Sequence, residues 1–160
     1  MDSTISILIN RAENEIFLAS AMKILSEEEK IRILMQVPPN MTFYSAAISH
    51  SYYSIFYSAK AILLTKGIIT TSPDAHKKTF DQFKQNFVDT GILDVKLLAI
   101  YKKIVVRADE LLGIFREEKQ KRGDFTYKTI PQANQEPAED SVKNARIFVS
   151  NIKKVIELIK

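Results

Sequence analysis

The sequence predicts an all-α protein, a helical bundle packed around one central helix. Residues 42–67 carry apolar side chains around most of a helix circumference, which is typical of a helix covered on several sides. The other periodic segments repeat apolar residues at spacings of three and four, and none alternates with the period of a strand. The 4 Gly and 5 Pro residues lie mostly between these segments, as expected for breaks between helices.

Two apolar rows run along the central segment. The first is Tyr44, Ile48, Tyr52, Ile55, Ala59 and Ile62, and the second is Ala46, Tyr53, Tyr57, Ala61 and Leu64. The positions left for solvent are mainly Ser45, Ser49, His50, Ser54, Ser58 and Lys60. Gly67 is expected to cap the C-terminus of this helix, because Gly readily adopts the left-handed conformation found there.

Two helices are predicted before the central one. Residues 4–25 are amphipathic, with an apolar face made of Ile5, Ile9, Ala12, Ile16 and Ala19. Ser26 and Glu29 have the spacing of a capping box, so a shorter helix is expected to begin there. It should end before Pro38 and Pro39.

A further helix is predicted from a strong start signal. Ser72 is expected at the N-cap, Pro73 at the first helical position and Asp74 near the positive end of the dipole. Residues His76 to Val88 should be helical. The inward side chains of this helix are expected to be Phe80, Phe83 and Phe87.

Two long helices complete the prediction. Residues 93–121 carry the seam Leu97, Tyr101, Ile104, Ala108, Leu111 and Phe115. A helix from Pro137 to Ile159 carries the row Ala138, Val142, Ala145, Val149, Ile152, Val155 or Ile156, and Ile159. Residues 122–136 between them lack periodicity, and a connection of this length is often functional.

Length and composition fit a single domain over residues 1–160. The chain is 46% hydrophobic, enough for a sizeable core. It has no Cys, in keeping with a reducing cytoplasm, and no apolar run of about 18 residues that would span a membrane. The N-terminus lacks the basic start of a signal peptide. We therefore expect a soluble, cytoplasmic protein. Its net charge of +4 is compatible with nucleic acid as a partner without requiring it.

Several kinds of chemistry are not expected. The only histidines, His50 and His76, lie in separate helices, so we predict no metal site. The glycines are too scattered for a phosphate-binding loop, and no Ser has a nucleophile-elbow context. We predict no cofactor. We expect His50 to be a hydrogen-bonded structural residue, and His76, in the first turn of its helix, to be exposed or capping.

A basic cluster is the main candidate for binding. It consists of Arg116, Lys119, Lys121, Arg122 and Lys128, with Phe125 and Tyr127 beside it. Cations could hold phosphates while the two rings stack on bases. The alternative is that the cations complement a helix C-terminus and are solvated, and the residues alone favour this interpretation.

The order of these motifs resembles a known family. SAAISHSYYSIFYSAKAILLTKG, AHKKTFDQF, KRGDFTY and PAEDSVKNARIFVSNI follow one another as in small stand-alone HEPN domains of prokaryotes, over about residues 10–158. The resemblance implies an up-and-down bundle of four long helices plus one short helix, and a homodimer. It also implies a minimal nucleotidyltransferase as partner in a toxin–antitoxin pair. Many HEPN proteins are metal-independent ribonucleases with an Arg, four to six residues, then a His.

The resemblance places the candidate site after the long helix. Arg122 fits the motif Arg, whereas Tyr127 stands where the His is expected. The nucleotide- or RNA-binding set is Arg116, Lys119, Lys121, Arg122, Asp124, Tyr127 and Lys128. We expect a dimer with little or no catalysis that binds RNA, nucleotide or the nucleotidyltransferase, which in some pairs adenylylates a Tyr such as Tyr127. The alternatives are a ribonuclease toxin with Arg122, Tyr127 or His50 in catalysis, and a purely structural helical adaptor.

Overall fold

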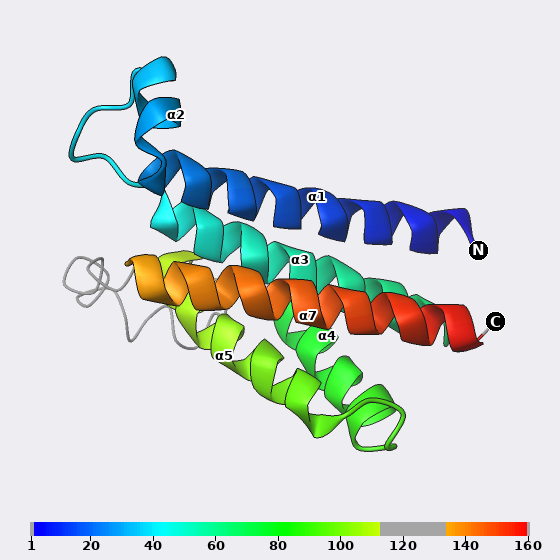
Figure 1. The fold of residues 1–160 in the computed structure, drawn as a ribbon. Helices are drawn as coiled ribbons and strands as arrows, with labels where there is room; N and C mark the ends of the chain where they lie inside the picture. The colour runs from blue at the N-terminus through cyan, green and yellow to red at the C-terminus, as the bar shows by residue number, and fades with distance from the viewer. Residues whose placement is uncertain (1, 113–133, 160) are drawn as a thin grey trace.

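The computed structural model describes residues 2–112 and 134–159, and all regular structure in them is helical (Figure 1). The long helices α1 (Ser3–Glu27), α3 (Tyr44–Leu64), α5 (Val95–Leu112) and α7 (Gln135–Ile159) run in alternating directions. The short helix α2 (Glu29–Leu34) projects from one end of the bundle, and α4 (Ala75–Phe83) lies beside α5. The predicted all-α, up-and-down bundle is confirmed.

Helix α3 is the centre of the bundle, as predicted. It contacts α1, α4, α5 and α7, and every member of its first apolar row except Tyr44 is buried. Gly67 follows the helix with φ 71°, and the amide of Ile68 donates to the carbonyl of Leu63 at 3.1 Å. Gly67 therefore caps the helix in the left-handed conformation, as expected.

The predicted solvent-facing side of α3 is wrong at two serines. Ser54 and Ser58 are completely buried. Their hydroxyls donate to carbonyls one turn back in the same helix, Ser54 to Ser51 at 2.7 Å and Ser58 to Ile55 at 2.9 Å. Each hydroxyl is therefore satisfied without water, and a small side chain lets neighbouring helices approach the backbone closely.

The link between α1 and α2 also differs from the prediction. Ser26 does not cap a new helix, because α1 continues through it to Glu27 and α2 begins at Glu29. The Ser26 hydroxyl donates to the carbonyl of Met22 at 2.8 Å and accepts the amide of Phe43 at 2.7 Å. Ser26 thus joins the end of α1 to the start of α3.

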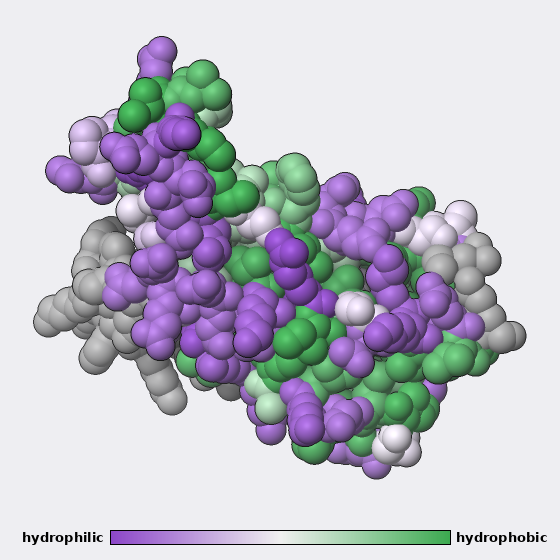
Figure 2. All heavy atoms as spheres, viewed as in Figure 1, coloured by the Kyte–Doolittle hydropathy of each residue, from purple (hydrophilic) through white to green (hydrophobic). Residues whose placement is uncertain are grey.

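Helix α2 exposes apolar side chains on the projecting end of the molecule. They are Ile31, Ile33, Leu34 and Met35, which are 39 to 79% exposed, and Figure 2 shows the hydrophobic surface at this projection. Arg32 anchors the projection through its guanidinium, which donates to the carbonyls of Leu25 and Pro38 at 3.0 and 3.1 Å. The position of α2 is therefore fixed by polar contacts more than by burial.

The residues at the start of α4 differ from the predicted cap, although the predicted helical range from His76 is confirmed. The helix begins at Ala75, because Asp74 has left-handed backbone angles (φ 61°, ψ 32°) and ends the run of helical residues there. The predicted N-cap role of Ser72 and the first helical position of Pro73 are wrong. The segment finishes in a π-helical turn, η1 (Lys84–Val88). The inward side chains are as expected at Phe83 and Phe87, which are buried, whereas Phe80 is half-buried.

Helix α7 begins two residues before the predicted Pro137 and presents the predicted apolar row to the core up to Ile156. The prediction is wrong at Ile159, which is 47% exposed at the last turn of the helix. Pro137 stays within the first turn, where its missing N–H costs no helical hydrogen bond. Phe148, which the predicted row omits, is also fully buried. None of the described helices combines the length and apolar character needed to cross a membrane.

Candidate functional site

The residues that the sequence assigned to binding follow α5 in the chain. Arg116, Lys119, Lys121, Arg122, Asp124, Tyr127 and Lys128 all lie outside the described residues. The structure does describe the two helices that flank them, α5 up to Leu112 and α7 from Gln135. The flanking contacts are therefore the part of this candidate site whose geometry is known.

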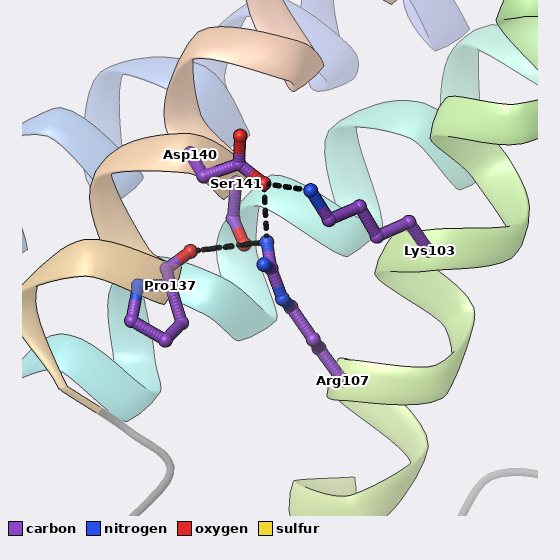
Figure 3. Close-up of polar contacts among 5 residues, drawn as sticks. All are labelled: Lys103, Arg107, Pro137, Asp140 and Ser141. Atoms are coloured by element: carbon purple, nitrogen blue, oxygen red, sulfur yellow. Dashed lines mark hydrogen bonds and ion pairs between the residues drawn. The ribbon is translucent and has the colours of Figure 1, made fainter.

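A cluster of polar contacts joins α5 to the first turns of α7 (Figure 3). Arg107 on α5 donates through Nη1 to Oδ2 of Asp140 at 2.7 Å, to the hydroxyl of Ser141 at 3.1 Å and to the carbonyl of Pro137 at 3.3 Å. Lys103, one turn earlier on α5, places Nζ 2.8 Å from the same Asp140 oxygen. We call these five residues the α5–α7 clamp.

The electrostatics of the clamp favour an ionised Asp140. Partial burial raises the pKa of this carboxyl, but the hydrogen bonds and charges of Lys103 and Arg107 outweigh burial and hold the pKa below its ordinary value. The Arg107 side chain is 24% exposed and the Lys103 side chain 53%, so Arg107 makes the better-shielded contact. The clamp therefore fixes the end of α5 against the start of α7, the two helices between which residues 113–133 lie in the chain.

His50, the one described candidate for catalysis, contacts a different helix. Its Nδ1 lies 2.6 Å from Oε2 of Glu15 on α1, and both side chains are partly exposed. When the neutral ring donates Nδ1–H to the carboxylate, Nε2 carries the lone pair and can accept a hydrogen bond. No contact joins His50 to the clamp within residues 2–112 and 134–159. Its expected hydrogen bond is present, and the sequence could not name Glu15 as the partner.

His76 is neither exposed nor capping, contrary to the prediction. It is half-buried against α3, where its ring stacks on Phe56 with centroids 4.4 Å apart and its Nδ1 lies 2.8 Å from the hydroxyl of Tyr52. Burial, aided by the positive charge of Lys60, lowers the pKa of His76. His76 is thus part of an aromatic cluster and is neutral near pH 7.

Other features of the described chain limit the chemistry. No three His, Asp or Glu side chains in the described ranges converge in a way that could hold a metal ion. Helix α5 buries the carboxyl group of Asp109, two residues after Arg107, and this side chain is 2% exposed. What the described geometry offers is a rigid attachment for the segment that holds the basic cluster.

Comparison with known proteins settles the family. Residues 5–155 match the HEPN domain, nearly the whole chain. The chain belongs to the HEPN family. Two relatives from Methanocaldococcus jannaschii, each named a "putative toxin", are both 30% identical to it. One alignment covers 84% of this chain and 80% of the relative, and the other covers 97% and 90%. A "UPF0332 protein" of Thermotoga maritima is 29% identical over 72% of this chain and 74% of its own length.

Sequence reasoning missed the residues of the clamp in this HEPN domain. Arg107 and Asp140 are 33 residues apart in the chain, and neither belongs to a motif that would pair them. The one available signal was the position of Arg107 beside the apolar seam of its helix, at Ile104 and Ala108. A charged side chain next to such a seam often reaches across to the neighbouring helix.

Proposed function

We propose that this HEPN domain is the toxin-like component of a toxin–antitoxin pair and binds RNA through residues 116–128. The main support is the composition of that segment, which holds Arg116, Lys119, Lys121, Arg122 and Lys128 together with two aromatic residues. Cations bind the phosphate backbone, and aromatic rings stack on unpaired bases. The names of the two Methanocaldococcus relatives agree with a toxin-like role.

The α5–α7 clamp supports this proposal from the structural side. A basic segment binds more tightly when its attachment points are already ordered, since less conformational entropy is lost on binding. Arg107 holds Asp140 at 2.7 Å and so joins the helices on either side of the segment. We propose that Asp124 and Tyr127 complete the binding set, with Asp124 orienting Arg122 and Tyr127 stacking on a base.

We propose a homodimer and a minimal nucleotidyltransferase as the protein partners. Both come from the HEPN resemblance. In this arrangement the nucleotidyltransferase is the antitoxin, and Tyr127 is the residue that it modifies. An adenylyl group on the Tyr127 oxygen would add a phosphodiester charge to a basic site and so weaken the binding of another phosphate.

The direct test is RNA binding, measured by fluorescence anisotropy with a labelled single-stranded RNA over a salt series. Lys121→Ala with Arg122→Ala should weaken binding and lower the salt slope by about 1.4, since each phosphate contact in single strands contributes about 0.7. The matched control is Lys96→Ala with Lys102→Ala on exposed positions of α5, which removes the same charge. Equal affinity of the two double variants, or no binding by the wild type, would overturn the proposal.

A ribonuclease is the second candidate, because His50 is oriented by a carboxylate. The Glu15–His50 contact of 2.6 Å resembles the pairing that holds a catalytic imidazole in one tautomer. In this mechanism Nε2 removes the ribose 2′-hydroxyl proton, and the 2′-oxygen attacks the adjacent phosphorus. The bond from phosphorus to the 5′-oxygen then breaks, the protonated imidazole returns its proton to that oxygen, and a 2′,3′-cyclic phosphate remains. Arg122 would hold the phosphate oxygens.

The test of catalysis is cleavage of total RNA without added metal. Cleavage by the wild type that is lost in both Arg122→Ala and His50→Gln would support the ribonuclease. His76→Gln is the matched control, because it removes the other histidine of the chain. Absence of cleavage by clean wild-type protein would reject this candidate and leave RNA binding as the function to test.

A further inference from the structure

A groove separates α1 and α7 on the outer surface of the bundle. Both helices pack mainly on α3, which lies behind them, and contact each other less extensively (Figure 1). Two hollows of about 330 and 460 Å³ follow the groove, and Arg146 lines both, so they adjoin. Figure 2 shows apolar surface here between the polar side chains along the two helices.

Aliphatic side chains line part of each hollow, and polar or charged side chains line the rest. Ile16 and Val149 line one hollow, and Ile24, Val142 and Ile147 line the other. Ile24 and Ile147 are 43% and 41% exposed, a large fraction for aliphatic side chains at a helix interface. No aromatic ring lines either hollow, so the groove offers no platform on which a nucleic-acid base could stack.

The borders of the groove carry more free positive than negative charge. Lys153 pairs with Glu13, and Lys23 pairs with Glu27 at 3.0 Å and lies 3.9 Å from Glu139. Among the described residues, the one hydrogen-bond partner of Arg146 is the hydroxyl of Ser20, to which it donates. In the part of the chain that the structure describes, the lining residues without an ion pair are the cations Lys143, Arg146 and Lys154 and the carboxylate Glu157.

We propose that this groove binds an amphipathic α-helix of a partner protein whose polar borders are acidic. A helix lying on two others places apolar residues at spacings of three and four into the spaces between them. Two adjoining hollows that each contain aliphatic side chains suit that spacing. Arg146 and Lys154 are eight residues apart on α7, about 12 Å along the helix. Carboxylates two turns apart on the partner helix would meet both cations. No residue that lines either hollow belongs to the segment 116–128, and the proposal does not depend on RNA binding by that segment.

The probe is a pair of designed helical peptides of about 18 residues, long enough for five turns. Both carry Leu at the same positions of one face. One has Glu on the flanking positions and the other has Lys. With a fluorescent label, anisotropy titrations against the full chain should show binding of the acidic peptide only, with an affinity that falls as salt rises.

Two variants locate the binding. The double variant Lys143→Glu with Arg146→Glu should weaken binding of the acidic peptide by about tenfold or more. The control, Lys96→Glu with Lys102→Glu on α5, changes the net charge equally and should leave the affinity unchanged. Ser150→Trp fills the groove at an exposed position without altering charge, and it should abolish binding while leaving the thermal unfolding midpoint unchanged.

Clear outcomes would overturn the proposal. Equal binding of the acidic and basic peptides would show that charge does not select the partner helix. No binding of the acidic peptide up to about 1 mM would show that the groove is not a binding site for such a helix, since that limit corresponds to very weak association. Loss of RNA affinity in the Lys143 and Arg146 variant without any peptide binding would make the groove a nucleic-acid surface instead. Dimerisation that Ser150→Trp abolishes would assign the groove to a second copy of this chain.

Discussion

The hydroxyl of Tyr52 and Nδ1 of His76 lie 2.8 Å apart and connect α3 to α4. Burial raises the pKa of the Tyr52 phenol far above its ordinary value, so the phenol stays protonated. The pKa of His76 is lowered by burial and by Lys60, so the imidazole is neutral near pH 7. The Tyr52 hydroxyl can therefore donate to Nδ1, which leaves the imidazole proton on Nε2.

This pair predicts a pH dependence of stability. The unfolded His76 titrates near 6.5 and the folded one at lower pH, so the unfolded state binds more protons between these values. The contribution of His76 to stability is therefore complete above about pH 6.5 and is lost as pH falls through the folded pKa. His76→Gln should lack this component. Urea unfolding at pH 7.5 and 5.5 should show a smaller loss for the variant than for the wild type, and an equal or larger loss would contradict the assignment.

Arg107 is predicted to contribute more to stability than Lys103, although both contact Asp140. Arg107 makes three contacts and is the more buried, so Arg107→Ala should lower the free energy of unfolding by about 1–3 kcal/mol. Lys103→Ala should cost less than about 1 kcal/mol, because its single ion pair is half exposed. Denaturant titrations of the two single variants test the ranking. Equal losses would mean that the α5–α7 clamp depends on charge alone.

The helices of this fold could be predicted because each repeats apolar residues with the helical period. Ile48, Tyr52 and Ile55 are buried on α3, as their spacing indicates. Helix starts were less predictable. Ser26 has a capping-box spacing but serves a long-range contact to Phe43, and Asp74 adopts a left-handed conformation that local sequence signals did not reveal. The tertiary contact to Phe43 accounts for the position of Ser26 inside α1.

Less of the candidate site followed from the sequence, because its contacts join distant residues. Arg107 and Asp140 are 33 residues apart and come together only when α5 packs on α7. His76 was assigned to the surface since a first-turn position is usually solvated, yet the ring lies over Phe56. The assignments of Arg122 and Tyr127 to binding stay predictions, since both lie outside the described residues.

Ser54 tests why small residues occupy the buried polar face of α3. The side chain is completely buried, and its hydroxyl bonds to its own helix. Ser54→Ala should change the free energy of unfolding by less than about 1 kcal/mol, because the donor is removed together with its need for a partner. Ser54→Leu should cost about 1–3 kcal/mol through overpacking. Ser45→Leu, at an exposed position of the same helix, is the control. A small effect of Ser54→Leu would show that the neighbouring helices can move apart.

Tyr101 offers the opposite case, a side chain whose polar group weakens the fold. Its ring is fully buried and lies 5.5 Å from Phe83 and 5.6 Å from Phe148, measured between ring centroids. Its hydroxyl has no hydrogen-bond partner among the described residues. Tyr101→Phe keeps the ring contacts and removes an unsatisfied buried group, so it should raise the free energy of unfolding by about 1 kcal/mol.

The matched control for Tyr101 is Tyr52→Phe, which deletes a hydroxyl that does have a partner in His76. This variant should lower the free energy of unfolding by about 1 kcal/mol, because it removes a hydrogen bond from a mostly buried site. Urea denaturation of both variants at pH 7 compares the two hydroxyls directly. A gain in the free energy of unfolding for Tyr101→Phe and a loss for Tyr52→Phe would support the conclusion that only the Tyr52 hydroxyl has a hydrogen-bond partner. A loss of stability in Tyr101→Phe would instead mean that the Tyr101 hydroxyl is satisfied in solution, by a buried water for example.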